Sequence, residues 1–137
     1  MRKRRRPATL LGLVLAGASC VWPSPERQLL LDYFHACQIY DTTVLARLST
    51  VPCNPRIDGV VENFEIESVE HLEQPASGEP PRRVTIRAMV RSFDQSPIEE
   101  RTLEVRMERR DGRWMVTGLM PSPASRTSPA ASSGRPS

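Results

Sequence analysis

Apolar residues in the second half of the chain recur at every second position, and this feature restricts the fold most. The even positions from 84 to 90 are apolar, as are the odd positions from 103 to 107. Around them Phe64 and Ile66 alternate with Glu65 and Glu67. Alternation of this kind is typical of strands with one face on a core and the other in water, and it predicts an antiparallel sheet.

Turn residues separate these segments and indicate how the strands connect. Asp111-Gly112 is a strong hairpin signal between 101–110 and the closing segment 113–119. The Pro- and Gly-containing segment 73–81 predicts a loop between the first two strands. The chain is therefore expected to form a four-stranded antiparallel meander.

Helical signals precede the strands. Ser24-Pro25-Glu26 combines a capping residue, a proline suited to the first turn and an acidic residue, and it predicts a helix over 25–39. Asp41 is a second capping candidate, followed by a shorter helix over 42–49 after a kink. Pro52 and Pro55 are expected to end helical structure. The fold class is thus α+β, with an N-terminal helix or helix pair packed on one face of a curved four-stranded antiparallel sheet.

The N-terminus has the pattern of an export signal. Residues 2–6 are all basic, and a short apolar run follows over 8–18. The pattern predicts a signal peptide over residues 1–19. An uncleaved anchor is the alternative, but the run is shorter than the roughly 20 residues that a membrane-spanning helix needs.

Two cleavage sites compete near Cys20. Gly17-Ala18-Ser19-Cys20 resembles a bacterial lipobox, in which the cysteine receives a lipid and becomes the first residue. Cleavage after Ala18 would instead leave Ser19 first and Cys20 unmodified. We expect lipidation of Cys20, with 20–24 as a short membrane-proximal linker. The chain would then lie on the periplasmic or extracytoplasmic face of a bacterial membrane.

The two remaining cysteines are expected to form a disulfide. An exported chain meets an oxidising compartment, and lipidation of Cys20 leaves Cys37 and Cys53 as a pair. The competing interpretation of Cys37 is a buried free thiol.

Charge and composition limit the possible partners. Without residues 1–19 the chain has 14 basic and 16 acidic residues, so the basic charge belongs to the leader and a nucleic-acid partner is not expected. Residues 121–137 contain only Pro, Ser, Ala, Thr, Gly and Arg, which predicts a disordered tail. The small domain is therefore expected over 25–120.

The order of elements and two motifs carry a family resemblance. The aromatic-rich first helix and the closing "DGRWMVTGL" strand resemble the nuclear transport factor two-like superfamily, in its exported bacterial lipoprotein type. The resemblance covers about 25–120, although no third helix is evident before the sheet. A cystatin-like layout, with one helix on a curved sheet, is the near neighbour. The superfamily includes enzymes that use a carboxylate base and tyrosines inside a cone-shaped pocket.

The residue types that this resemblance points to are Tyr33, Tyr40 and Asp41, which mark a possible pocket. Asp41 also fits a helix cap, and the tyrosines also fit core positions. With two histidines and no clustered ligands, no metal site or cofactor is expected, and no catalytic residue is assigned.

The strand pattern bears on the choice between binding and catalysis. It places the strand glutamates on the polar side, where two charged sets are expected to pair across neighbouring strands: Glu62, Glu65, Glu67 and Glu70 with Arg82, Arg83, Arg87 and Arg91. We therefore expect a non-catalytic binding or accessory domain of the cell envelope. Its expected partners are the membrane surface, through the lipid on Cys20, and an envelope protein or small apolar ligand. A small pocket enzyme of the isomerase or hydrolase type is the alternative.

Overall fold

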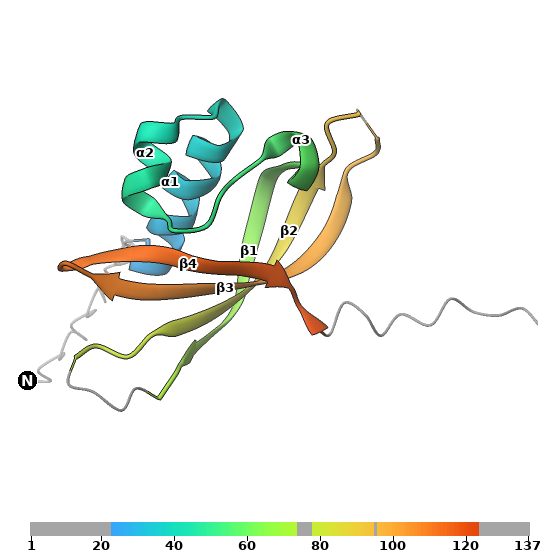
Figure 1. Ribbon diagram of the computed structural model, residues 1–137. Helices are drawn as coiled ribbons and strands as arrows, with labels where there is room; N and C mark the ends of the chain where they lie inside the picture. The colour runs from blue at the N-terminus through green and yellow to red at the C-terminus, as the bar shows by residue number, and fades with distance from the viewer. Residues whose placement is uncertain (1–22, 74–77, 95, 124–137) are drawn as a thin grey trace, which may run out of the picture.

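A computed structural model describes residues 23–73, 78–94 and 96–123 of this chain. Three helices come first: α1 (Pro25–Ile39), α2 (Thr42–Leu48) and α3 (Pro55–Asp58). Four strands follow: β1 (Val60–His71), β2 (Arg82–Arg91), β3 (Glu99–Arg110) and β4 (Arg113–Pro121). The strands form one open antiparallel sheet in the order β1-β2-β3-β4, with the helices gathered over one of its faces (Figure 1). The α+β class and the meander therefore agree with the sequence prediction.

Side-chain caps begin the first two helices as expected. The Ser24 hydroxyl accepts a hydrogen bond from the Arg27 N–H at 3.2 Å, and Pro25 occupies the first turn of α1. The Asp41 carboxylate accepts the Val44 N–H at 3.0 Å and caps α2. Each cap satisfies a backbone donor that the first helical turn leaves without a partner.

The kink between these helices is made by one residue with a left-handed backbone conformation. Tyr40 has a φ of 55°, and the Asp41 N–H returns to the Ala36 carbonyl at 2.9 Å. This helix-ending geometry satisfies carbonyls of the last turn while reversing the chain. As a result α2 packs beside α1 and both helices contact β4.

A third helix is present where none was expected. Pro55 begins α3 instead of ending helical structure, because its fixed φ suits a first helical position. Asn54 caps this helix, accepting the Arg56 N–H at 3.1 Å. The expectation that the two prolines only terminate helices was therefore wrong for Pro55.

The core lies between the helices and the inward rows of the strands. In register, Val84 pairs with Val105 and Ile86 pairs with Leu103, so apolar rows of neighbouring strands stand side by side. The buried apolar residues come from both layers: Leu29, Leu30, Tyr33, Phe34, Ala36, Cys37, Leu45, Phe64, Val84, Ile86, Ala88, Val90, Val105, Met107 and Val116. Burial of this single apolar layer provides the main driving force for folding.

The outer face of the sheet carries the expected ladder of opposite charges. Arg83 pairs with Glu70 at 3.1 Å, Arg91 with Glu62 at 2.5 Å, and Arg87 with Glu65. These side chains are largely exposed, so each pair contributes little to stability. The ladder keeps this face polar and nearly neutral.

Arg82 was expected on this outer face but lies on the helix-bearing one. It has the same strand parity as Val84, and its guanidinium pairs with Glu26 of α1 and, at 3.0 Å, with Glu79. Its Cζ also stands 4.3 Å from the centre of the Trp114 ring. The alternation therefore continues through Arg82, and ion pairing with stacking makes the charge tolerable there.

The sheet continues one residue beyond the expected domain end, and the next residue is still hydrogen-bonded to β3. Pro121 pairs with Leu103 as the last residue of β4, and the Ser122 N–H donates to the Thr102 carbonyl at 2.9 Å. Ser122 is buried. These residues were assigned to the disordered tail, but backbone pairing with β3 holds them in the sheet. The rest of the expected tail, from 124, lies outside the described residues.

Among the described residues, no helix has the length and apolar character needed to cross a membrane.

Candidate functional site

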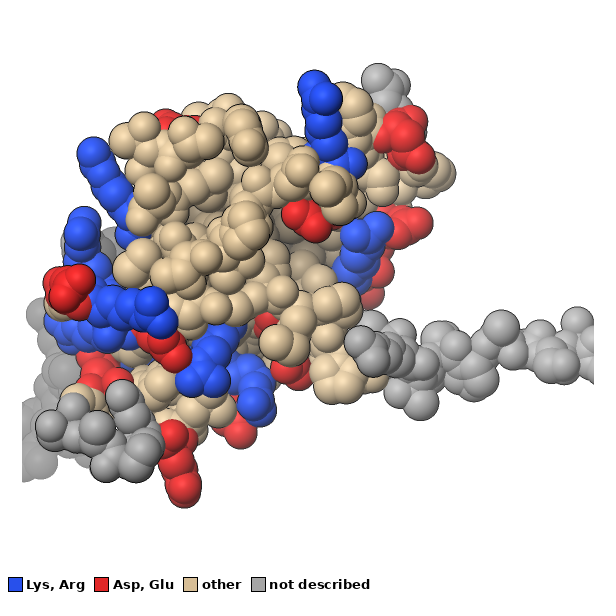
Figure 2. Space-filling view, in the orientation of Figure 1, with Lys and Arg blue, Asp and Glu red and all other residues tan. Residues whose placement is uncertain are grey.

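A cavity of about 240 Å³ lies between α1, α3 and the helix-facing side of the sheet. Most of its lining is apolar: Tyr33, Phe34, Cys37, Pro52, Cys53, Ile57, Gly59, Val61, Val90, Leu103, Leu119, Met120 and Pro121, with Asp58 and Arg101 as the charged members. Seen from outside, the centre of this face is mostly uncharged, with charged side chains toward its edges (Figure 2). Concave apolar sites with a few polar groups are the usual form of small-molecule sites.

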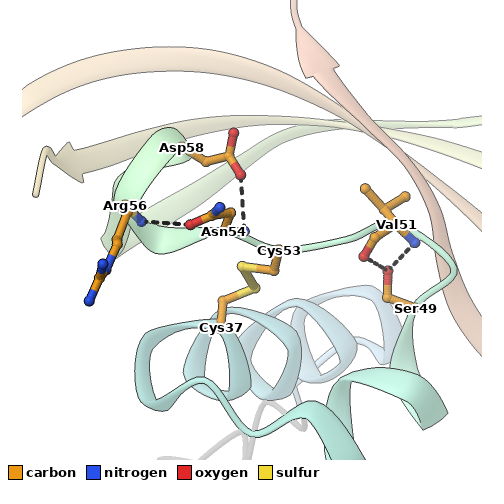
Figure 3. The surroundings of a disulfide bond; sticks show 7 residues. All are labelled: Cys37, Ser49, Val51, Cys53, Asn54, Arg56 and Asp58. Atoms are coloured by element: carbon orange, nitrogen blue, oxygen red, sulfur yellow. Dashed lines mark hydrogen bonds between the residues drawn. A yellow bond between two sulfur atoms is a disulfide. The ribbon is translucent and has the colours of Figure 1, made fainter.

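One wall of the cavity contains a disulfide between Cys37 and Cys53 (Figure 3). Cys37 is a buried residue of α1, and Cys53 lies in the segment between α2 and α3. Their Cα atoms are 5.8 Å apart, within the range that a disulfide spans. The bridge ties the connection leading to α3 directly to the first helix.

Hydrogen bonds between residues close in sequence shape the chain on both sides of Cys53. The Ser49 hydroxyl accepts the Val51 N–H at 2.8 Å, and on the far side the Asp58 carboxylate accepts the Asn54 N–H at 3.1 Å. Gly59 then leaves α3 with a φ of 80°, a conformation that favours glycine. These contacts hold α3 at the edge of the cavity.

Tyr33 supplies a buried phenol to the lining. Burial raises the pKa of Tyr33 above its ordinary 10.0, a hydrogen bond with Ser49 opposes this shift, and the negative Asp58 adds to it. Tyr33 is therefore uncharged at neutral pH. It can offer a hydrogen bond but does not act as an anion there.

Arg101 is a lining residue that the sequence analysis missed. It pairs with Ala88 of β2 and lies two residues before Leu103 on β3. Its side chain therefore points to the same, helix-facing side of the sheet as Leu103. Glu99, two residues before the predicted strand, shares the parity of Arg101, and its side chain is 59 % exposed at the end of the row. The signal was available, because the alternation that marks Leu103 as inward also marks Arg101.

The three suggested pocket residues do not come together. Tyr33 lines the cavity, whereas Tyr40 is 61 % exposed and stands outside it. Asp41 is committed to capping α2. Tyr40 was also a core candidate, and its position as the left-handed end of α1 explains why it points to solvent instead. Cys20, the suggested lipid site, lies outside the described residues.

The lining does not contain a recognisable acid–base pair among the described residues. Asp58 is the one carboxylate residue among the described lining residues; it is exposed and accepts a backbone N–H. His35 is exposed on α1 and is not a lining residue. The described part of the chain also holds no group of three or more residues arranged as metal ligands.

Comparisons of the chain with protein-family models, curated proteins and solved structures found no match.

Proposed function

We propose that this chain is an exported, lipid-anchored, non-catalytic binding domain of a bacterial cell envelope. Its cavity between α1, α3 and the sheet would hold a small, mostly apolar molecule. Membership of the nuclear transport factor two-like superfamily is part of this proposal, supported by the order of helices and strands. The observation that carries the binding function is the apolar lining of the cavity, with an exposed carboxylate at Asp58.

An enzyme of the isomerase or hydrolase type is the second candidate, because Tyr33 and Asp58 line the same cavity. A general base in such a pocket gains its strength from burial or from a charged neighbour. Asp58 instead is exposed and is used to hold the Asn54 N–H. The geometry therefore favours binding over proton transfer.

The lipid anchor is supported by the sequence before α1. Only residues 21–24 separate Cys20 from Pro25, the first residue of α1. Four extended residues reach roughly 14 Å, so a lipid on Cys20 would keep the domain at the membrane surface. The mass of the mature protein, after expression of the full chain in a bacterium, tests the anchor. We expect a lipid mass on Cys20, and an unmodified chain beginning at Ser19 would refute it.

Binding is tested by NMR titration of the mature protein with 1-hexanol, an uncharged ligand of seven non-hydrogen atoms. A volume of 240 Å³ corresponds to about eight atoms at the ~30 Å³ that a water molecule occupies in the liquid. We expect saturable shifts at cavity residues.

A matched pair of variants locates the site. Leu103→Trp fills the cavity and should abolish the shifts, whereas Leu31→Trp places the same side chain at an exposed position of α1 and should preserve them. Shifts that are absent in the native protein, or that persist unchanged in Leu103→Trp, would refute the proposed site.

A further inference from the structure

Arg101 stands where the strand pattern calls for an apolar residue. The inward row of β3 continues from it through Leu103, Val105 and Met107. Its side chain is 40 % exposed, so the charge stands at the open end of this row and is partly in water. Arg101 therefore places an accessible cation beside the apolar lining of the cavity.

The contacts of Arg101 compensate its charge only in part. Its Nη2 and Nε donate to one carboxylate oxygen of Glu99, at 3.0 and 3.3 Å, two residues earlier on the same strand. The Glu99 side chain is 59 % exposed, so the pair is accessible to solvent and weak. A guanidinium has five N–H donors in a planar fork, and one oxygen of Glu99 leaves most of that fork available.

The other charged groups of the same face are committed elsewhere. Asp58 accepts the Asn54 N–H, and no ion pair among the described residues joins it to Arg101. Arg82, at the opposite end of the face, already has Glu26, Glu79 and Trp114 as partners. Among the described lining residues, Arg101 is the single cation.

We propose that the cavity binds an amphiphile with one carboxylate, whose apolar part fills the cavity while Arg101 holds the carboxylate. This inference rests on the proposed binding function and names its ligand class. The planar fork of arginine matches the two oxygens of a carboxylate, and the ligand would displace Glu99 from it. One cation beside a resident carboxylate suits a monoanion better than a doubly charged phosphate monoester.

The test compares hexanoate with 1-hexanol in the same NMR titration of the mature protein. We expect hexanoate to bind about tenfold more tightly, on the scale of a charge-assisted hydrogen bond at a partly exposed site. Higher salt should weaken hexanoate and leave 1-hexanol unchanged, because exposed charges are screened. Hexyl phosphate, which presents the headgroup chemistry of a phosphorylated lipid, should bind less tightly than hexanoate.

Four variants, one of them a matched control, assign the preference to Arg101. Arg101→Gln should remove the tenfold advantage of hexanoate, and Arg101→Lys should restore part of it by returning the charge without the fork. Arg106→Gln is the matched control, because Arg106 also pairs with a glutamate two residues away on β3, Glu108 at 2.9 Å, but belongs to the other face. It should bind both ligands as the native protein does. Glu99→Gln should strengthen hexanoate two- to threefold, a change that a purely structural Arg101–Glu99 pair would not produce.

The outcomes separate this inference from the proposed function. If 1-hexanol binds and hexanoate binds no more tightly, the carboxylate inference is overturned and the binding function stands. The same conclusion follows if Arg101→Gln and Arg106→Gln affect hexanoate equally, or if hexyl phosphate binds more tightly. If neither hexanoate nor 1-hexanol binds in the cavity, both proposals are overturned.

Discussion

The disulfide between Cys37 and Cys53 is expected to carry a large share of the domain's stability. The double variant Cys37→Ala/Cys53→Ala removes it while keeping both positions apolar. The two cysteines are 16 residues apart in sequence, and their Cα atoms are 5.8 Å apart. The bridge therefore closes a loop that includes α2 and, in one wall of the cavity, ties the segment before α3 to α1.

The magnitude follows from the size of this loop. Closing a loop of about 16 residues in the unfolded chain lowers its entropy by an amount worth about 3 kcal/mol at 25 °C. A domain of this size has a total free energy of unfolding of about 5–15 kcal/mol. With a urea dependence of about 1.5 kcal/mol/M, the midpoint should fall by about 2 M.

Urea unfolding followed by circular dichroism measures the effect. The native protein in reductant is the packing control, because it keeps both sulfur atoms and loses only the bond. Its midpoint should fall nearly as far as that of the double variant, while Cys20→Ala should leave the midpoint unchanged. If the reduced and oxidised proteins unfold within about 0.3 M of each other, the loop-entropy reasoning is refuted.

Three further changes test the turns and the buried phenol. Gly112→Val should lower the free energy of unfolding by about 1 kcal/mol or more, because its φ of 77° disfavours a branched residue; an unchanged urea midpoint would contradict this. Gly59→Ala should cost about 1–3 kcal/mol, since a Cβ there would lie 2.8 Å from Val90 Cγ1 and 2.9 Å from the Arg91 carbonyl oxygen at a φ of 80°, and a native-like midpoint would show that the chain relaxes. The raised pKa of Tyr33 means that its contribution to stability is present below pH 10.0 and is lost as pH rises through the higher folded-state value. Tyr33→Phe should therefore lose less stability between pH 9 and 11 than the native protein, and equal losses in urea midpoint would count against a buried phenol.

The sheet was predictable from the sequence because the signal is local and repeated. Alternation assigns each strand residue to a face, and Asp111-Gly112 fixes the last hairpin, where both residues have positive φ. The interruptions were not predictable in the same way. The register shifts within β1, between Val61 and Asn63 and between Ile66 and Ser68, depend on how the strand bends along β2.

The third helix was missed because its signals are ambiguous in sequence alone. A proline both ends a preceding helix and begins a new one, and four residues are too few to show a period. What decides the case is the local set of bonds at Asn54 and Asp58, together with the bridge at Cys53. A capping asparagine directly before a proline was the available clue.

The site was predictable only in part, because residue type says less than strand parity. Tyr40 and Asp41 were suggested as pocket residues because of their side-chain chemistry. Tyr40 instead ends α1 and points to solvent, and Asp41 caps α2. Arg101 was not considered as a site residue, although extending the alternation two residues before Leu103 places it inward. A charged residue on an apolar row is the more useful signal, because burying it requires a partner.

Arginines occupy inward positions at both ends of the helix-facing side of the sheet, but their partners differ. Arg82 and Arg101 both occupy inward positions, but Arg82 lies beside Glu26 at the start of α1, where Glu79 and Trp114 also contact its guanidinium and only its Nε has no hydrogen-bond partner among the described residues. Arg101 lies at the other end, beside the cavity that Cys37 lines near the close of α1. Between Pro25 and Cys37 the helix rises by about 18 Å, at 1.5 Å per residue. Arg82 and Arg101 are thus separated by most of the length of α1, and of the two only Arg101 lines the cavity.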